Sequence, residues 1–434
     1  MDSKPVVSRM SNNYTEIFDL LAFDDYKGAE KLILSKHKII SLPLDAFRGL
    51  KILKSLDLSE NSILDIEADV FKDLSTLEEL NFSFNQLSSL SGAAFSNVPS
   101  LLHLNLSNNR IAELNETTAN QLPKLTHLDL SHNKLRTIHS SFLESLNTLR
   151  FLDVSFNAIG TLSGETMLKL GSLIELCASH NELEKISGEY LPVSLKILSV
   201  GHNPITFLPK SLSQIRELNI EDNKISSIEA DAASLKKLER LNISGNGLTE
   251  FPDAKFQDLK TLDLSRNKLT SIPDALTFYN LPILEELSIG GNPIRNLTFK
   301  SELRLRKLIL RNLDLLKTIE IHAFRHLKGV NDGCINLTVS ENRRLNVIEN
   351  GAFDGIAICY VKVESLDISK NAFTRISSAA IKSAGKFVAQ KGIDLQMNPF
   401  NCDCESQWML NDLVPHLYKI NAELLEDLRY DPWK

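Results

Sequence analysis

The chain has 434 residues, 43% of them hydrophobic and 24% charged, a composition that argues against intrinsic disorder. Its 55 acidic and 48 basic residues give a formal net charge of −7, which disfavours general binding to nucleic acids or to acidic membranes. Five cysteines are too few for a disulfide-dense scaffold, and the sequence contains no apolar run of about 18 residues that would predict a membrane span.

The first residues, MDSKPVVSRMSNNYTE, lack the apolar core of a secretory signal peptide. We expect residues 1–28 to form an N-terminal segment or the remnant of a partial repeat.

A leucine template repeats along the chain from residue 29 onward. It reads L-x-x-L-x-L-x-x-N-x-L, and five successive repeats begin at Leu53, Leu77, Leu101, Leu125 and Leu149, each 24 residues after the last. Continuing the alignment gives sixteen repeats spaced by 20 to 29 residues, and fourteen of them carry Asn at the ninth position. Sixteen copies in phase predict a solenoid, because such repeats bury their apolar faces only by stacking on one another.

Each copy of the template predicts one short strand. The leucines at positions four and six alternate with polar residues, so both point into the core. The Asn at position nine turns the chain out of the strand, where its amide can satisfy backbone groups of the turn. Phe47, Phe71 and Phe95, each eighteen residues after the start of a repeat, should stack into a spine. We therefore expect an α/β solenoid with a parallel sheet on its concave side and irregular turns in the longer repeats near 305–390.

These repeats resemble the leucine-rich repeat family over about residues 29–400. The 24-residue spacing and the segments DAFRGL, DVFKDL and AAFSNV are similar to the extracellular typical class, which includes Toll-like receptor ectodomains, Slit-like guidance proteins and small proteoglycans. The resemblance implies a curved horseshoe of about 16 repeats over residues 29–398, with the usual protein-binding role of that class.

The segment from Asn398 to Cys404, followed by Trp408, resembles the opening of the extracellular C-terminal cap. In that family the paired cysteines, here Cys402 and Cys404, bond to two further cysteines downstream. This sequence departs from the pattern, because no cysteine follows Cys404. We therefore expect residues 399–434 to be an incomplete cap and the chain to be a fragment of a longer protein.

Aromatic and histidine side chains interrupt the polar positions of the middle repeats. Five occupy position eight, and three occupy position three: Phe84, His132, Phe156, His180 and His202, then His103, His127 and Phe151. Exposed rings on a solenoid are typical anchors of a protein interface, and the histidines could make binding depend on pH. The alternative is that neighbouring rings stack on adjacent strands with a structural role only. A metal site is not favoured, because no further ligand accompanies His127 and His132.

Other polar residues are interpreted mainly as structural. Position five is often Asp or Asn and position seven is mostly Ser, as suits an exposed strand face. Opposite charges on successive repeats, such as Glu285 and Arg306, should pair. Arg304, Arg306, Lys307 and Arg311 gather in one repeat, so an anionic glycan is a second partner class to consider.

Six sequons on or near the repeats predict glycosylation in an extracellular protein: Asn81, Asn105, Asn115, Asn242, Asn296 and Asn336. Asn115 and Asn296 lie outside the strand template and are the better candidates. Cys334 and Cys359 either pair across an irregular repeat or are two buried thiols. Cys177 sits at position five without an evident partner.

No nucleotide-binding loop, zinc-protease motif or nucleophile elbow is present, so we expect no enzyme and no cofactor or metal. The leading hypothesis is an extracellular or cell-surface recognition module that binds a protein ligand or receptor through its concave face or a flank. By resemblance its setting is adhesion, guidance, matrix organisation or innate recognition. The alternative is a cytoplasmic leucine-rich repeat scaffold or enzyme regulator, which the missing signal peptide favours.

Overall fold

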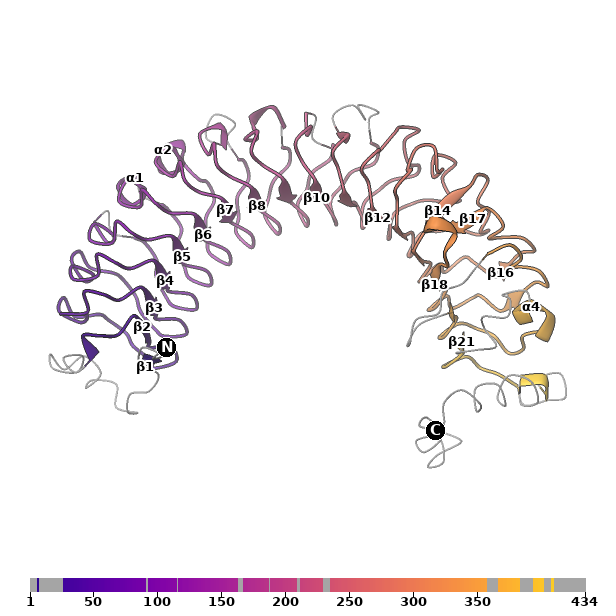
Figure 1. Ribbon diagram of the computed structural model, residues 1–434, viewed down its shortest axis with the longest axis horizontal. Helices are drawn as coiled ribbons and strands as arrows, with labels where there is room; N and C mark the ends of the chain where they lie inside the picture. Colours follow the sequence, from indigo (N-terminus) through magenta and orange to yellow (C-terminus); the bar gives the residue numbers. More distant parts are fainter. Residues whose placement is uncertain are drawn as a thin grey trace. The chain divides into compact units, whose positions relative to one another are not determined.

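The computed structural model describes residues 6–7, 26–90, 93–114, 116–162, 167–186, 188–208, 211–228, 235–356, 366–382, 393–401 and 407–409. The chain divides into two compact units, Met1–Asn219 and Ile220–Lys434, which we term the N-terminal and C-terminal units. Each unit is a stack of repeats in which a short strand is followed by a turn and a return segment (Figure 1).

The strands of the N-terminal unit are β1 (Val6–Val7), β2 (Lys31–Ile33), β3 (Ser55–Asp57), β4 (Glu79–Asn81), β5 (His103–Asn105), β6 (His127–Asp129), β7 (Phe151–Asp153), β8 (Glu175–Cys177), β9 (Ile197–Ser199) and β10 (Glu217–Asn219). They pair in parallel in chain order, with Leu80 opposite both Leu56 and Leu104. The described helices on the return segments are short: α1 (Glu116–Ala119), α2 (Ser140–Glu144) and the 3-10 turn η2 (Gly188–Tyr190).

The main strands of the C-terminal unit are β11 (Arg240–Asn242), β12 (Thr261–Asp263), β13 (Glu286–Ser288), β15 (Lys307–Ile309), β18 (Asn336–Thr338), β20 (Leu366–Asp367) and β21 (Ile393–Asp394), again paired in parallel. Helical segments are η4 (Val330–Asp332) and α4 (Ser378–Lys382). The longer repeats, for which the sequence predicted irregular turns, contain turns at 321–326 and 350–355 and strands as well. Two additional parallel pairs occur there, β14 (Leu303–Leu305) with β17 (Leu327–Gly329) and β16 (Thr318–Ile319) with β19 (Val347–Ile348).

The predicted template matches the observed strands. Within the described residues, each of the sixteen predicted repeats has a strand within its third to fifth positions. In β4 the middle residue, Leu80 at position four of its repeat, is buried while its two neighbours reach solvent. The parallel-sheet solenoid expected from the leucine spacing is therefore confirmed.

The Asn at position nine connects each turn to the preceding repeat. Asn85 donates from Nδ2 to the carbonyls of Leu58 and Phe82 at 2.9 and 3.1 Å, and its Oδ1 accepts from the amide of Ile63 at 3.0 Å. Asn246 makes the same set of bonds in the C-terminal unit. Buried backbone groups of the turn are satisfied in this way, as the sequence predicted.

Phenylalanine rings fill the return side of the core where the sequence places them. Phe47 and Phe71 stack with ring centroids 5.9 Å apart, and Phe71 and Phe95 lie 6.4 Å apart with nearly parallel planes. The same arrangement recurs in the C-terminal unit, where the Phe324 and Phe353 rings stack at 5.6 Å. These buried rings hold successive repeats at a constant spacing, which fixes the spacing of the strands as well.

Position eight has a left-handed backbone in all sixteen repeats. The φ angle there ranges from 48° at Asp222 to 69° at Gly291, and the residue is Phe or His in five of the repeats. Phenylalanine has no intrinsic preference for this region. The stacking of repeats imposes it, because the position-eight amide donates to the position-seven carbonyl of the next repeat, as His132 does to Ser155 at 2.9 Å.

In the described parts of the chain no helix has both the length and the apolar character needed to cross a membrane.

Candidate protein-binding surface

Four side chains at position eight form a stacked column in the N-terminal unit. We call this column the ring ladder; it consists of His132, Phe156, His180 and His202. Successive ring centroids are 4.0, 4.0 and 3.9 Å apart, and the planes of neighbouring rings differ by at most 14°. Stacking was one of the two interpretations of these residues, and it does not bury them, since Phe156 remains 43% exposed. The ladder is therefore both preorganised and accessible.

The three rings at position three form a second, shorter row. His103 meets His127 edge to face at 4.4 Å, and His127 stacks on Phe151 at 5.9 Å. The carboxylate of Glu79 lies 4.0 Å from Nδ1 of His103. Partial burial, then the charges of His103 and Arg150, lower the pKa of His127, so its imidazole resists protonation.

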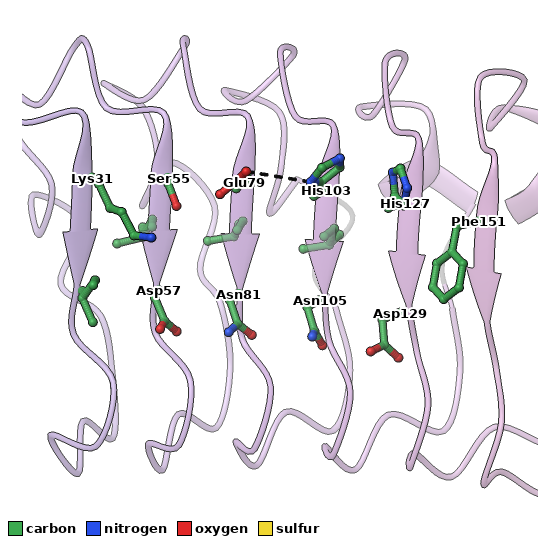
Figure 2. A pocket seen from close by; sticks show the side chains of 14 residues that line it. Lys31, Ser55, Asp57, Glu79, Asn81, His103, Asn105, His127, Asp129 and Phe151 are labelled. Carbon is green, nitrogen blue, oxygen red and sulfur yellow. Dashed lines mark ion pairs between the residues drawn. The ribbon is translucent and has the colours of Figure 1, made fainter. Parts of the chain in front are cut away.

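These position-three rings stand at one end of a shallow groove across β2 to β7, with a volume of about 500 Å³. Figure 2 shows two parallel rows of side chains on the strands. One row runs Lys31, Ser55, Glu79, His103, His127 and Phe151, and the other contains Asp57, Asn81, Asn105 and Asp129. The sheet thus presents acidic, amide and aromatic groups at regular intervals on one face.

The side chains at position five of the repeats stabilise the turn that follows each strand. Oδ1 of Asp57, Asn105 and Asp129 accepts the backbone amide two residues later, at 2.9 to 3.0 Å. Asp153 on β7 does the same for Ser155 at 2.8 Å. The structural interpretation of this row is thereby confirmed.

The charge of the groove is acidic, which the sequence analysis did not anticipate. One lysine faces three carboxylates among the lining residues. In the described structure no lysine or arginine lies within ion-pair distance of Asp57, Asp129 or Asp153. Burial, with repulsion from Asp129, raises the pKa of Asp153. The available signal was the recurrence of Asp at position five without a basic residue beside it in neighbouring repeats.

Phe84 is separated from the other rings. It is 56% exposed, and none of the ring contacts within the described chain joins it to the ladder. Asn108 occupies position eight of the intervening repeat, with a φ of 54° like its neighbours. Seven of the eight predicted anchors therefore gather in two rows, and the eighth is separated from the ladder by one repeat.

The cysteines have different surroundings. Cys177 is a free thiol at the end of β8, and burial, followed by the charges of Asp153 and Glu175, raises its pKa to about 12. A thiol so strongly protonated is a poor nucleophile at neutral pH. Cys334 is disulfide-bonded to a cysteine outside the described residues, so the alternative of a buried thiol does not hold for it. Cys359, Cys402 and Cys404 lie outside the described residues, so their pairings stay predictions.

The predicted glycosylation sites differ in how accessible they are. Asn296 is exposed, while Asn81, Asn105 and Asn242 are half-buried and each uses Oδ1 to accept a backbone amide. The Oδ1 of Asn336 is buried without a hydrogen-bond partner. Asn115 lies outside the described residues. Of the sequons that the structure describes, Asn296 is the one best placed for modification.

The predicted basic cluster is largely neutralised by nearby carboxylates. Arg304 pairs with Glu302 at 2.8 Å, Arg306 with Glu285 at 3.3 Å, and Arg311 with Asp367 at 3.5 Å. The expected pairing of Glu285 with Arg306 is confirmed. An anionic glycan would compete with these carboxylates, and that partner stays a prediction. The described residues contain no group of three or more His, Cys, Asp or Glu arranged to hold a metal ion.

Solved structures with similar folds come from several organisms. A leucine-rich repeat protein of Leptospira interrogans has a TM-score of 0.63 and 25% identity, covering 94% of this chain and 99% of that one. The APL1 leucine-rich repeat domain has a TM-score of 0.54 and 27% identity, covering 68% and 76%. The receptor TLR13, solved in complex with ssRNA13, has a TM-score of 0.57 and 24% identity, and the match covers 91% of this chain and 53% of that one. That last likeness concerns the fold alone. No curated protein sequence matches the chain significantly.

Family models cover most of the sequence. The leucine rich repeat model matches overlapping segments from 27–87 to 123–183 and from 193–248 to 236–294. The model of a BspA type leucine rich repeat region matches 292–386, where the additional strand pairs occur. The chain belongs to the leucine-rich repeat family.

Proposed function

We propose that this protein is a non-catalytic recognition module that binds a protein partner through the surface formed by the groove of β2 to β7 and the ring ladder. The leucine-rich repeat solenoid is an interaction fold that typically has no catalytic role, and its exposed strand face is the usual place for contacts. In this chain we assign these contacts to the N-terminal unit.

The ring ladder is the observation that carries the proposal. Exposed aromatic side chains usually lose conformational entropy when they are bound, and this reduces affinity. The stacked rings of His132, Phe156 and His180 are held at 4.0 Å spacing before any partner arrives. Rigid aromatic groups beside a polar groove are the composition expected of an interface hot spot with its polar rim.

We propose an extracellular or cell-surface setting, of the adhesion, guidance, matrix or innate-recognition type. The exposed sequon at Asn296, the repeats with phenylalanine spines and the cap-like segment support it.

We also propose 1–28, 29–398 and 399–434 as N-terminal segment, solenoid and incomplete cap. Trp408 supports the cap, because its indole N–H donates to the carbonyl of Ile376 at 2.9 Å. Glycopeptide mapping of protein secreted by mammalian cells tests the setting, and an unmodified Asn296 would contradict it.

The binding surface is tested with alanine variants of its rings. Cell-surface and secreted proteins that cross-link to the immobilised chain are identified, purified and titrated against it by biolayer interferometry. We expect Phe151→Ala and Phe156→Ala each to weaken binding by about tenfold or more, the effect of losing an aromatic hot spot. Phe278→Ala is the matched control, because Phe278 is a 38% exposed ring of the C-terminal unit. Equal affinity of the wild type and both ring variants would reject this surface.

A further inference from the structure

One repeat, with Asn108 at position eight, separates Phe84 from the ring ladder, and we call this position the gap. The backbone continues through this position without change, since Phe84 and Asn108 each donate an amide hydrogen to the next repeat at 3.0 and 2.9 Å. Both residues have the same left-handed conformation, with φ of 56° and 54°. A ring at Asn108 would therefore join Phe84 to His132. The side chain that is present leaves this column interrupted.

The amide of Asn108 is turned towards its own repeat. Its Nδ2 donates to Oγ of Ser107 at 3.3 Å, and Ser107 is itself buried. If the ladder continued at its spacing of 4.0 Å per repeat, two steps would place a ring at Phe84 about 8 Å from that of His132, and a planar group needs about 3.5–4.0 Å on each side. The gap is therefore as wide as one planar group sandwiched between two rings.

We propose that this gap receives the guanidinium group of an arginine from the protein partner, an inference that rests on the proposed function of the surface. A guanidinium is planar, stacks on aromatic faces and forms hydrogen bonds through its edge. Charge complementarity favours it over a neutral ring, because the adjoining groove has three carboxylates and one lysine. The carboxylates of Asp57 and Asp129 have no cationic partner in the described chain.

Other position-eight residues nearby do not compete for the guanidinium. Glu60, one repeat before Phe84, already pairs with Lys36 at 3.2 Å. The arginine is therefore held by stacking at the gap and by the groove carboxylates beyond it. A lysine offers the same charge without the plane, and a tyrosine offers the plane without the charge, so the two contributions can be separated.

The test measures fluorescence anisotropy of three labelled peptides on the full chain, in which four arginines, lysines or tyrosines alternate with glycine. We expect the arginine peptide to bind about fivefold or more tightly than the lysine and tyrosine peptides. Asn108→Phe fills the gap with a ring, and this should weaken the affinity for the arginine peptide by about fivefold or more. Asn108→Ala should bind it at least as well as the wild type.

Asn312→Phe is the matched control, because Asn312 also occupies position eight, with φ of 56°, in the C-terminal unit. It should leave binding of the arginine peptide unchanged, and thermal unfolding of both Phe variants checks that they are folded. The inference is overturned if Asn108→Phe binds the arginine peptide like the wild type, or if the lysine or tyrosine peptide binds equally well. Titrating a purified protein partner against Phe156→Ala in parallel separates the two claims. A loss there with no effect of Asn108→Phe rejects the arginine gap alone, and no loss rejects the proposed surface.

Discussion

Position eight has the same left-handed backbone in both units but different side chains. In the N-terminal unit it holds the ion pair of Lys36 and Glu60 in the first two repeats and, further along, the stacked rings from His132 to His202. In the C-terminal unit it holds charges, and Arg266 forms two hydrogen bonds with the carboxylate of Asp222 at 2.9 and 3.0 Å. Further along, Lys370 pairs with Glu341 at 3.4 Å. One backbone position therefore supports two kinds of side-chain column.

Glycine allows the ion pair to span two repeats. Asp222 and Arg266 are 44 residues apart in sequence, and Gly245 occupies position eight of the repeat between them. A Cβ atom at Gly245 would lie 1.8 Å from Oδ1 of Asp222, and one at Gly291 would lie 2.9 Å from Cγ of Arg266. The long arginine side chain thus lies along the column because its neighbours have no side chains.

The difference shows which column is available to a partner. The charges of the C-terminal unit are already matched to one another, and displacing them would cost their hydrogen bonds. The rings of the N-terminal unit contact one another by stacking, and their exposed edges and end faces gain from contact with a partner. We therefore place recognition on the rings and a structural role on the ion pairs.

The largest expected effect concerns the Asn at position nine, which the two units share. Asn85→Ala and Asn246→Ala should each lower the free energy of unfolding by about 3 kcal/mol, because each leaves several buried backbone groups unsatisfied. Urea denaturation followed by circular dichroism measures the change. The losses should be similar in the two units. A large difference between them would mean that the repeats are not equivalent at this position and would weaken the comparison.

The second prediction concerns binding through the rings. Phe156→Leu keeps an apolar side chain but removes the planar face that stacks between His132 and His180, so affinity for a purified partner should fall by about tenfold. Arg266→Leu makes a comparable change at position eight of the C-terminal unit, and affinity should stay within about twofold of the wild type. Surface plasmon resonance compares the two. If Arg266→Leu had the larger effect, recognition would belong to the charged column instead.

The third prediction concerns the glycine between the paired charges. Gly245→Ala should lower the free energy of unfolding by about 1–2 kcal/mol, because the new methyl group displaces Asp222 and a non-glycine residue is less favourable at φ of 66°. Gly160→Ala in the N-terminal unit is the control. A Cβ atom there would meet nothing within 4 Å, so the substitution should be neutral or stabilising. A stabilising effect of Gly245→Ala in the same thermal-denaturation experiment would show that the glycine has no spacing role.

The repeated strands and the Asn ladder could be predicted from sequence because each depends on one residue type at a fixed offset. Contact between rings such as His132 and Phe156 followed from their 24-residue spacing. The left-handed backbone beneath them was not predicted, since non-glycine residues adopt it rarely and a ring such as Phe156 gives no signal for it. The link from Asp222 to Arg266 was also missed, because it skips a repeat, whereas only adjacent repeats were compared.

The additional strands were hidden for another physical reason. Leu303 and Leu305 alternate with a polar residue, but Leu305 also fits the first position of the following repeat and was assigned to it. A three-residue strand carries too little periodicity to be separated from the next strand, which begins at Lys307. Similarly, the gap at Asn108 is not evident from composition, because its meaning depends on the rings at the same position in neighbouring repeats.

The smallest effect is expected from the acidic side of the binding surface. Burial and then repulsion by Asp129 raise the folded-state pKa of Asp153 above its ordinary value of 3.8, so ionisation of this carboxyl disfavours the folded chain at neutral pH. Asp153→Asn removes that charge, and the amide can still accept from the Ser155 N–H, as Asn105 does at the same position at 2.9 Å. We expect stability at pH 7 to rise by less than about 1 kcal/mol.

The pH dependence of this variant provides the sharper test. A raised folded-state pKa means that wild-type Asp153 takes up its proton more readily when folded, so its destabilising contribution fades as the pH falls through that pKa towards 3.8. The advantage of Asp153→Asn should therefore be largest at pH 7 and shrink on acidification. Asp263→Asn in the C-terminal unit, with a matching bond to Ser265 at 2.8 Å, is the control. If Asp153→Asn stabilises the chain and also weakens binding of the arginine peptide, the carboxylate contributes to binding at a cost in stability. If it changes neither binding nor stability at any pH, this carboxylate plays no part in the surface, and only the rings distinguish the two units.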